Sequence, residues 1–314
     1  MRVVFFGLPL AGLAIARAGH DVVLAGICRK GAAGSRRLRK TIGDDRVLMR
    51  PDVDDPSLLA RVSALAPDLF VSWFWTTRLP ISLVAAAKHG GFGVHPSLLP
   101  RWRGADPYFW AIDAGDEVTG VTAHRLDAEY DTGAMLGQRV VRIDPRWDSW
   151  TLARALDRPS LALLVETVDA FAAGRPPREM SQDESQVTEA PAPDESLLEL
   201  DFHQSADAVL RRVRAAAPYP GAWTFVGDSG GNDDAALVVT RAEKAPAPPG
   251  LLPGEAAVRD GKVVVAARDE GVALLAGRLV LDDDTEKVVD AREIAGLLLR
   301  PAGASSAPLA GDSG

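Results

Sequence analysis

The chain has 314 residues and a formal net charge of −8 at pH 7, a length sufficient for two ordinary globular domains. The acidic balance argues against a protein that binds nucleic-acid backbones, because such proteins neutralise phosphates with a basic excess. The single cysteine, Cys28, excludes an internal disulfide and a cysteine-based zinc site.

The N-terminal apolar run, Val3 to Phe6, is the first predicted strand. It is too short for a signal peptide. No apolar run reaches the ~20 residues that a membrane-spanning helix needs. We therefore expect a cytoplasmic protein without a membrane partner.

The first 140 residues alternate short apolar runs with helix-type patterns. The expected strands are residues 3–6, 22–27, 68–75 and 91–94, and the expected helices are residues 9–18, 56–65 and 81–88. Continuous apolar strands alternating with helices predict a Rossmann-like α/β domain, with a parallel sheet covered on both faces. Such sheets bind ligands beyond the carboxyl ends of their strands. Pro9 stands where a dinucleotide fingerprint needs glycine, so a nicotinamide cofactor is disfavoured.

The remaining sequence indicates a change of architecture. Residues 151–174 predict a long helix with a break near Pro159, residues 176–193 a polar connecting segment, and residues 205–216 another helix. The β-type runs that follow are residues 222–226, 236–240, 262–266, 272–276 and 279–281. Five short strands separated by turns predict a small barrel. We expect a catalytic domain over residues 1–190, a connecting strand and helix over 191–220, an OB-like β domain over 221–300 and a disordered tail over 301–314.

The stretch from Gly93 to Leu136 carries the candidate chemistry. His95 follows a predicted strand, where a parallel sheet exposes its ligand crevice. Asp131 precedes Thr132 and Gly133, a turn that can aim its carboxylate inward. A histidine oriented by a carboxylate is a general-base arrangement. Two such residues this far apart in a sequence are, on spacing alone, more often a coincidence than a site.

The surrounding residues change that judgement, because they resemble the folate-dependent formyltransferases. This family includes methionyl-tRNA, glycinamide ribonucleotide, sugar-amine and hydroxyornithine formyltransferases, and the hydrolase domain of formyltetrahydrofolate dehydrogenase. Its signature is Asn-x-His, Ser-Leu-Leu-Pro and a downstream Asp-x-Gly. The matching segments here are His95, residues 97–100 and residues 131–133, and residues 103–104 and 119–122 match as well. The resemblance continues through residues 200–202 and 218–223 into a small C-terminal barrel.

The resemblance implies a donor, an acceptor and a set of site residues. The donor is 10-formyltetrahydrofolate, the acceptor is an amine, and no metal is required. His95 would accept the amine proton or stabilise the tetrahedral intermediate, and Asp131 would orient His95. Donor binding is assigned to Phe74, Trp75, Ser97, Leu98, Leu99, Pro100, Asp127 and Gly133, and acceptor binding to Arg103, Tyr108 and His124. His124 is also compatible with a hydrogen-bonded histidine of the site wall.

One position departs from the signature, because Gly93 replaces its asparagine. That asparagine donates a hydrogen bond to the formyl oxygen, and losing such a donor costs about 2.7–4 kcal/mol of transition-state stabilisation. Three interpretations stay open. Another group fills the gap in an adapted transferase, or the chemistry shifts towards hydrolysis of the donor, or the site binds folate with little turnover.

The acceptor is not specified by the sequence. Six cations lie between Arg29 and Lys40, either on a solvated loop and helix or on an anion-recognising rim. A small amine, such as an amino sugar, nucleotide sugar or amino-acid type amine, is favoured over tRNA. The reasons are the net negative charge of the chain and the pairs Phe74-Trp75 and Ala123-His124, which look more like those of the small-amine members. The oligomeric state is not predicted.

Overall fold

The computed structural model describes residues 1–226, 235–280 and 285–298, so the predicted tail over 301–314 lies outside the described residues. The chain forms two compact units. Unit 1 comprises Met1–Ala111, Asp116–Trp147 and Thr151–Ala192, and unit 2 comprises Ile112–Gly115, Asp148–Trp150 and the described residues from Pro193 to Leu298. Within the described part of the chain, no helix is long and apolar enough to cross a membrane.

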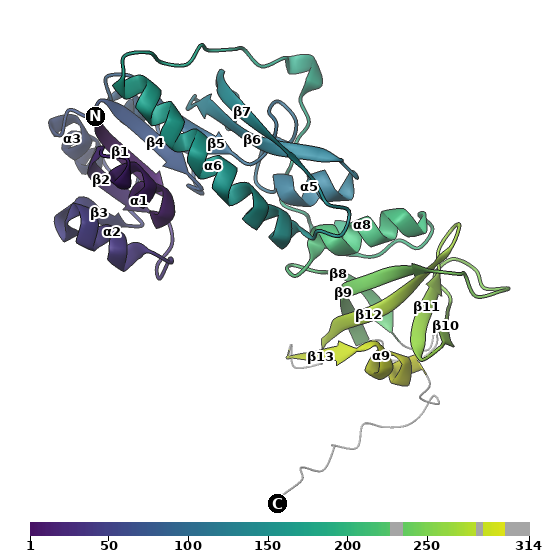
Figure 1. Ribbon diagram of the computed structural model, residues 1–314. Helices are drawn as coiled ribbons and strands as arrows, with labels where there is room; N and C mark the ends of the chain where they lie inside the picture. Colours follow the sequence, from purple (N-terminus) through teal and green to yellow (C-terminus); the bar gives the residue numbers. More distant parts are fainter. Residues whose placement is uncertain (227–234, 281–284, 299–314) are drawn as a thin grey trace, which may run out of the picture. The chain divides into compact units, whose positions relative to one another are not determined.

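Unit 1 is built on a seven-stranded sheet in the order β3-β2-β1-β4-β5-β6-β7 (Figure 1). The strands are β1 Arg2–Gly7, β2 Asp21–Ile27, β3 Val47–Met49, β4 Leu69–Trp73, β5 Gly91–His95, β6 Val118–Arg125 and β7 Met135–Arg142. The first five pair in parallel, whereas β6 and β7 join the edge in antiparallel pairs. The predicted parallel α/β sheet is therefore confirmed, with an antiparallel extension that was not predicted.

Helices cover both faces of this sheet, which explains the continuous apolar strands. The helices are α1 Pro9–Arg17, α2 Ser35–Ile42, α3 Pro56–Ala64, α4 Ile81–Ala85, α5 Pro107–Asp113 and α6 Ser149–Ala172. Phe6 and Phe70 pack with residues of α3 and α4 in one buried cluster. On the other face, the Trp73 indole N–H donates to Ser160 of α6 at 2.7 Å, and Phe92 stacks on Phe171 of the same helix.

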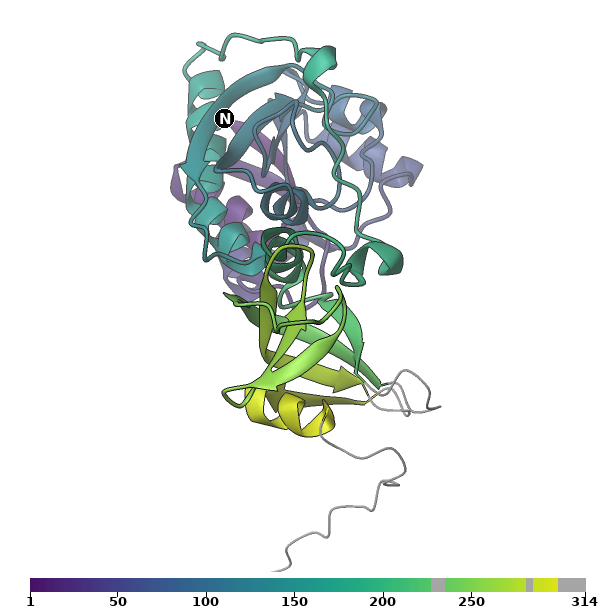
Figure 2. The same cartoon turned by 90° about the vertical axis from the view of Figure 1, so that its right-hand side faces the viewer.

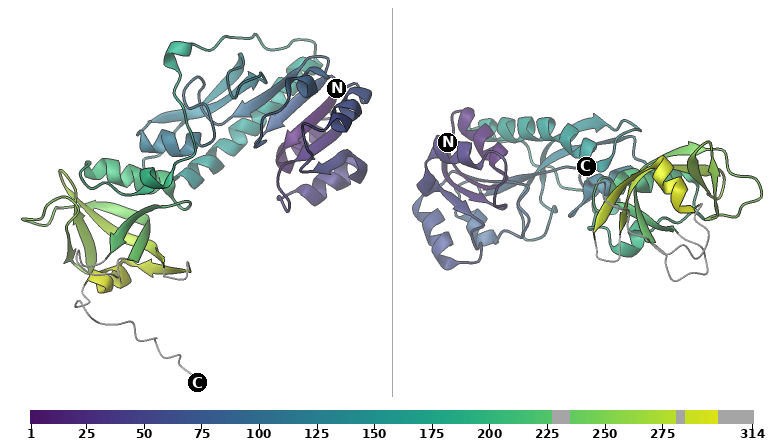
Figure 3. Two further views of the ribbon diagram at one scale, coloured as in Figure 1. Left: turned by 180° about the vertical axis from the view of Figure 1, so that it is seen from behind. Right: turned by 90° about the horizontal axis from the view of Figure 1, so that it is seen from below.

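One prediction for the end of unit 1 needs correction. Helix α6 continues through Pro159 instead of breaking there, because Leu156, Leu163 and other side chains on both sides of the proline are buried. The polar segment that follows belongs mostly to unit 1, as an extended strap over residues 173–192 (Figure 3). The strap contains the short turn Glu184–Gln186 and pairs with the sheet edge through Met135 and Met180.

Unit 2 is an antiparallel β domain, as predicted, with α7 Glu195–Leu198 and α8 Ala206–Ala216 preceding its strands (Figure 2). The strands are β8 Ala222–Val226, β9 Ala235–Ala245, β10 Ala256–Arg259, β11 Lys262–Ala266, β12 Gly271–Val280 and β13 Glu286–Asp290, followed by α9 Ala291–Leu298. The runs predicted separately over 272–276 and 279–281 form one strand, β12, within the described residues. Its register slips between Leu274 and Gly277, where Gly277 leaves room for a close approach of Val238.

Candidate functional site

The β5–β6 pair places two histidines on one face of the sheet. In the antiparallel ladder Gly93 lies opposite His124, and His95 lies opposite Thr122. Residues directly opposite each other present their side chains to the same face, and so do alternate residues of one strand. His95 and His124 therefore point the same way, and their ring centroids are 6.4 Å apart. Both are almost completely buried, with 7% and 5% of their surface exposed.

A turn after β6 brings Asp131 to the two histidines. Asp131 adopts a left-handed backbone conformation, with φ at +56°. Its Oδ2 accepts a hydrogen bond from the Gly104 N–H at 3.0 Å. The Gln182 side chain donates to the backbone oxygens of Asp131 and Gly133 at 2.7 and 2.8 Å. The carboxylate is thus held in place by both the loop after β5 and the strap.

The three side chains form one cluster around the Asp131 carboxylate. His95 Nδ1 lies 3.4 Å from Oδ2, and His124 Nε2 lies 3.5 Å from Oδ1. The opposite ring nitrogens contact backbone carbonyls: His95 Nε2 lies 2.8 Å from the Trp102 oxygen and His124 Nδ1 lies 2.9 Å from the Arg125 oxygen. A carbonyl oxygen only accepts, so each histidine carries its proton on that side. In their neutral forms, both imidazoles turn an unprotonated nitrogen towards the carboxylate.

Burial decides the charge of His124. Removal from water lowers the pKa of His124 from 6.5 to about 4, helped by the nearby His95 and Arg103 and opposed by Asp131 and the Arg125 carbonyl. His124 is therefore neutral at pH 7. A neutral imidazole with a free ring nitrogen is a proton acceptor.

These side chains line a cavity of about 970 Å³ in unit 1. Gly93, His95, Tyr108, His124 and Asp131 contribute to its wall. Its charged lining residues are Arg29, Arg78, Asp127, Glu129, Asp131 and Glu189. Carboxylates thus outnumber guanidinium groups four to two, and the cavity favours a cation at the site. Within the described part of the chain, no group of three His, Cys, Asp or Glu side chains is arranged to hold a metal ion.

Three residues predicted to bind the donor line this cavity, namely Phe74, Trp75 and Asp127. Phe74 sits in a left-handed conformation with φ at +54°, and the Cys28 thiol donates to its carbonyl. The indole N–H of Trp75 is buried and has no hydrogen-bond acceptor among the described residues. A buried donor without an acceptor is costly, so this group suits a ligand that brings an acceptor.

The other five predicted donor residues lie elsewhere in the structure. Ser97, Leu99, Pro100 and Gly133 are not part of the cavity wall, and Leu98 faces a second, smaller hollow. Ser97 instead bonds to the Arg101 carbonyl at 2.6 Å, and the Thr122 hydroxyl donates to the Ser97 carbonyl and accepts from Leu99 N–H. The Ser-Leu-Leu-Pro segment therefore stabilises the loop that follows His95.

Two of the three predicted acceptor residues, Tyr108 and His124, line the cavity, and Arg103 does not. Burial and the nearby charges of Asp157 and Asp106 raise the pKa of Tyr108 well above its usual value, so its hydroxyl keeps its proton. The Arg103 guanidinium is bound by Gln182 and Glu184 of the strap at 2.8–3.1 Å. Arg103 thus fixes the strap in this structure.

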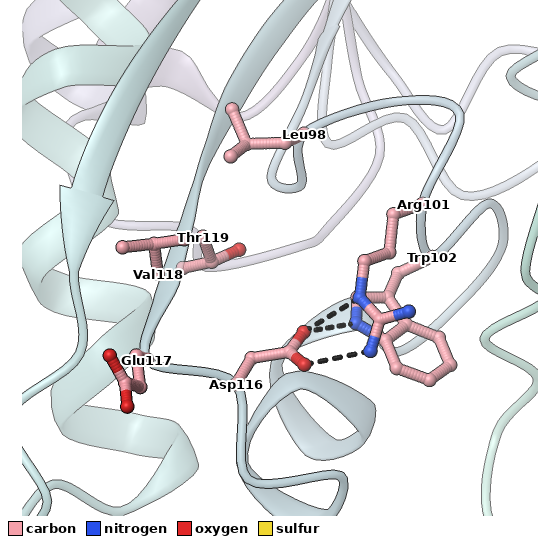
Figure 4. A pocket seen from close by; sticks show the side chains of 7 residues that line it. All are labelled: Leu98, Arg101, Trp102, Asp116, Glu117, Val118 and Thr119. Atoms are coloured by element: carbon pink, nitrogen blue, oxygen red, sulfur yellow. Dashed lines mark hydrogen bonds and ion pairs between the residues drawn. The ribbon is translucent and has the colours of Figure 1, made fainter. Parts of the chain in front are cut away.

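The smaller hollow, of about 180 Å³, shows how the His95 loop is anchored (Figure 4). Asp116 accepts hydrogen bonds from Arg101 Nε and Nη2 and from the Trp102 indole, at 2.7–2.9 Å (Figure 4). The Arg101 guanidinium also lies over the Trp102 ring, 4.2 Å from its centroid. Since the Trp102 carbonyl accepts a hydrogen bond from the Nε2–H group of His95, Asp116 positions His95 through Trp102.

The strap residues Gln182 and Thr188 are site-supporting residues that the sequence did not reveal. Gln182 joins Arg103 to the Asp131 turn, and Thr188 accepts from Trp102 N–H at 2.9 Å. Neither residue belongs to a recognisable motif. Their partners lie far away in the chain, so no local pattern marks them.

Comparison of the sequence with known proteins shows which family the chain belongs to. Residues 29–168 match the formyl transferase family model, and residues 194–295 match the formyl transferase C-terminal domain model. A methionyl-tRNA formyltransferase from Thiobacillus denitrificans is 36% identical over 80% of this chain and 84% of its own length. The chain belongs to the formyltransferase family. The predicted resemblance and the predicted enzyme class are thereby confirmed.

Other members of the formyltransferase family resemble the chain over most of its length. A methionyl-tRNA formyltransferase from Anaeromyxobacter dehalogenans is 34% identical over 90% of this chain and 93% of its own length. Among solved structures, HypX from Aquifex aeolicus in complex with tetrahydrofolic acid has a TM-score of 0.62 at 20% identity and covers 96% of this chain and 48% of its own. An N-formyltransferase from Helicobacter canadensis, in complex with folinic acid and dTDP-3-aminofucose, has a TM-score of 0.63 at 13% identity and covers 87% and 98%. These two structures share the fold.

Proposed function

We propose that this formyltransferase transfers the formyl group of 10-formyltetrahydrofolate to a primary amine at the cluster of His95, His124 and Asp131. The supporting observation is that cluster itself: two imidazole nitrogens and a carboxylate meet at the wall of a cavity of about 970 Å³. A site of this volume suits an organic ligand of cofactor size. The unpartnered indole N–H of Trp75 and the adjacent Phe74 suit a flat ring that carries hydrogen-bond acceptors.

The residues of the cluster perform the proton chemistry. The donor, when bound, supplies an electrophilic formyl carbon. The acceptor amine loses its ammonium proton to solvent and, in its neutral form, attacks that carbon, forming a new C–N bond. His95 then takes the one further proton that the nitrogen must lose. Asp131 stabilises the resulting imidazolium. His95 returns the proton to the departing N10 nitrogen of the folate as the old C–N bond breaks, so the overall reaction needs no oxidant and no external acid.

The charges of the cavity support a small amine as acceptor. Most amines are protonated in water, and an ammonium group is attracted to a wall on which carboxylates exceed guanidinium groups. The negative excess disfavours the phosphates of an RNA end at the same place. Arg29 and Arg78 remain to contact an anionic part of the donor or of the acceptor.

Methionyl-tRNA is the second candidate acceptor, and two observations favour it. The relatives with 34–36% identity quoted above are methionyl-tRNA formyltransferases. Helix α2 also presents Arg36, Arg37, Arg39 and Lys40 within eight residues. A basic helix within unit 1, which carries the candidate site, suits a phosphate backbone.

One assay separates these alternatives. The purified enzyme is mixed with 10-formyltetrahydrofolate, and donor consumption is followed with no acceptor, with a panel of amino sugars and amino acids, and with methionyl-tRNA at low and high salt. We expect consumption that depends on a small amine and yields its formamide. Turnover only with methionyl-tRNA and steep salt sensitivity would establish the second candidate. Release of formate without any acceptor would show a hydrolase instead, and binding without turnover would refute the proposed function.

A further inference from the structure

Three residues form a row across the sheet of unit 1, one from each of three neighbouring strands. Ser72 of β4 is in register with Gly93 of β5, and Gly93 lies opposite His124 of β6. Residues in register on neighbouring strands point to the same face of a sheet, and neighbouring strands lie about 4.8 Å apart. All three residues line the cavity of about 970 Å³. Gly93 therefore leaves a gap in the cavity wall between the side chains of Ser72 and His124.

The gap over Gly93 has room for part of a ligand. A Cβ atom at Gly93 would lie 3.4 Å from Leu126, 3.6 Å from the Ser72 carbonyl oxygen and 3.7 Å from His124 Nε2, which are ordinary van der Waals distances. The backbone at Gly93 has an extended strand conformation, so the glycine is not explained by a special dihedral angle. The missing side chain thus changes the shape of the cavity wall and not the path of the chain.

Ser72 is a polar residue in a buried strand. The other residues of β4 are apolar, and only 8% of the surface of Ser72 is exposed. Among the residues that the structure describes, none forms a hydrogen bond with the Ser72 hydroxyl group. Buried hydroxyl groups normally have a hydrogen-bond partner, because leaving one without a partner is costly. A ligand in the cavity can supply the missing partner.

Among the described polar groups that border the gap, only the Ser72 hydroxyl can donate a hydrogen bond. The Ser72 carbonyl only accepts, and His124 Nε2 carries no proton because Nδ1 donates the proton of the neutral ring to the Arg125 carbonyl at 2.9 Å. A hydroxyl group rotates, so it can turn its proton towards a ligand oxygen. An oxygen atom bound next to Gly93 therefore finds its donor in Ser72.

The reacting formyl group must lie close to this gap. His95, which takes the proton of the attacking amine, follows Gly93 by two residues on β5, on the same face and about 6.6 Å further along the strand. As the amine attacks, an electron pair of the C=O bond moves onto the formyl oxygen. The negative charge that develops there needs a hydrogen-bond donor, whereas the nearby Asp131 carboxylate can only accept.

We propose that the Ser72 hydroxyl group donates a hydrogen bond to the formyl oxygen and stabilises its negative charge during the reaction. This inference rests on the proposed amine formylation. Ser72 would then serve from β4 the purpose that the asparagine of the family signature serves from position 93. The hydroxyl keeps its proton throughout. The electron pair returns from the oxygen to the carbon when the bond to N10 breaks, so the reaction needs no further proton or co-reactant.

The variant Ser72→Ala separates this role from a structural one. The hydroxyl makes no hydrogen bond to the described residues, so we expect the melting temperature to stay the same or to rise. We expect kcat to fall about 10²-fold, and the KM for the donor to change less than kcat. Ser72→Thr keeps a hydroxyl group and should stay within about tenfold of the wild type.

A second buried serine provides the matched control. Ser160 of α6 accepts a hydrogen bond from the Trp73 indole on the other face of the sheet and is not part of the cavity wall. Ser160→Ala should lower the melting temperature, because the indole N–H loses its acceptor, and leave kcat within about threefold of the wild type.

Position 93 allows a test by rescue. Gly93→Asn introduces an amide donor beside Ser72, and its Cβ fits at this position. We expect Gly93→Asn to raise the kcat of Ser72→Ala at least about tenfold, because one donor replaces the other. A Ser72→Ala enzyme within about threefold of the wild type, or a loss that Gly93→Asn does not reduce, would overturn the inference. So would a rescue of Tyr108→Phe in place of Ser72→Ala, since Tyr108 also carries a neutral hydroxyl on the cavity wall.

Infrared spectroscopy of a bound donor analogue keeps this test separate from the proposed function. The probe is 10-formyl-5,8-dideazafolate with ¹³C in the formyl group, because a hydrogen bond to the formyl oxygen lowers the stretching frequency of its C=O bond. We expect a lower frequency on the wild type and on Ser160→Ala than on Ser72→Ala. Equal frequencies on the wild type and Ser72→Ala would overturn the inference even if the enzyme formylates amines. The expected difference in an enzyme that formylates no amine would refute the proposed function and leave the Ser72 hydrogen bond.

Discussion

Replacement of Asp131 by asparagine is the change whose outcome the geometry defines most closely. The Gly104 N–H donates to Oδ2, so the amide oxygen of the new side chain in Asp131→Asn would keep that position. The amide NH₂ group would then occupy the Oδ1 position, 3.5 Å from His124 Nε2, and donate to it. The substitution thus removes the negative charge between the histidines and also covers one of the two imidazole lone pairs.

The size of the effect follows from the distances. At 3.4–3.5 Å, a carboxylate and an imidazolium attract each other by about 5 kcal/mol at an effective dielectric constant of about 20. The full value is reached only when a histidine is protonated, which is the state that forms during proton transfer. Since about 1.4 kcal/mol corresponds to tenfold in rate, we expect kcat of Asp131→Asn to fall by about 10²–10⁴.

The kcat of Asp131→Asn is measured from steady-state donor consumption with the best acceptor from the panel. The melting temperature serves as a control and should change little, because the amide preserves the bond to Gly104. Unchanged binding of 5-formyltetrahydrofolate would show that the donor site is intact. A variant with kcat within about threefold of the wild type would refute the pairing of the carboxylate with the histidines as the source of catalysis.

Three further predictions concern the supports of the site and its pH dependence. Gln182→Leu leaves buried groups of Arg103 and the Asp131 turn without hydrogen-bond partners. We therefore expect the free energy of unfolding, measured in urea, to fall by about 3 kcal/mol and kcat to fall with it. An unchanged urea midpoint would contradict this supporting role of Gln182. Asp116→Ala removes the acceptor of the Trp102 indole, so we expect the free energy of unfolding to fall by about 1–3 kcal/mol and the pH profile of kcat to shift. A lower free energy of unfolding with an unchanged pH profile would show that Asp116 has only a structural role. Burial lowers the pKa of His124 from 6.5 to about 4, so between pH 4 and 6.5 the unfolded chain binds more protons than the folded chain. The free energy of unfolding therefore rises with pH over this range, by about 3 kcal/mol at most. Urea unfolding at pH 4.5 and 7.5 should therefore show a smaller pH difference for His124→Asn than for the wild type, and equal differences would count against the buried neutral histidine.

The strands at the centre of unit 1 were predictable, because their side chains obey one local rule. β1, β2, β4 and β5 are buried on both faces and read as continuous apolar runs. β7 did not stand out, since it lies at the sheet edge and exposes Val140 and its neighbours. Pro159 indicates a helix break locally, but the buried residues on either side of it hold α6 together.

The candidate site was predictable where it depends on strand ends and not where it depends on distant contacts. His95 and Asp131 were found from their motifs, and the structure brings their side chains to 3.4 Å. The position of Gly93 opposite His124 could not be predicted without the pairing of β5 and β6. Likewise, the partners of Arg103 come from the strap, more than seventy residues later in the chain.

The most direct test of the account follows a labelled formyl group. 10-Formyltetrahydrofolate carrying ¹³C in the formyl group is supplied to the wild-type enzyme and to His95→Ala, together with the amine that supports turnover. The account predicts that the label appears in a formamide of the amine with the wild type, and that His95→Ala forms it at least about a hundredfold more slowly. Label that appears only as formate, or equal rates for the two proteins, would contradict it.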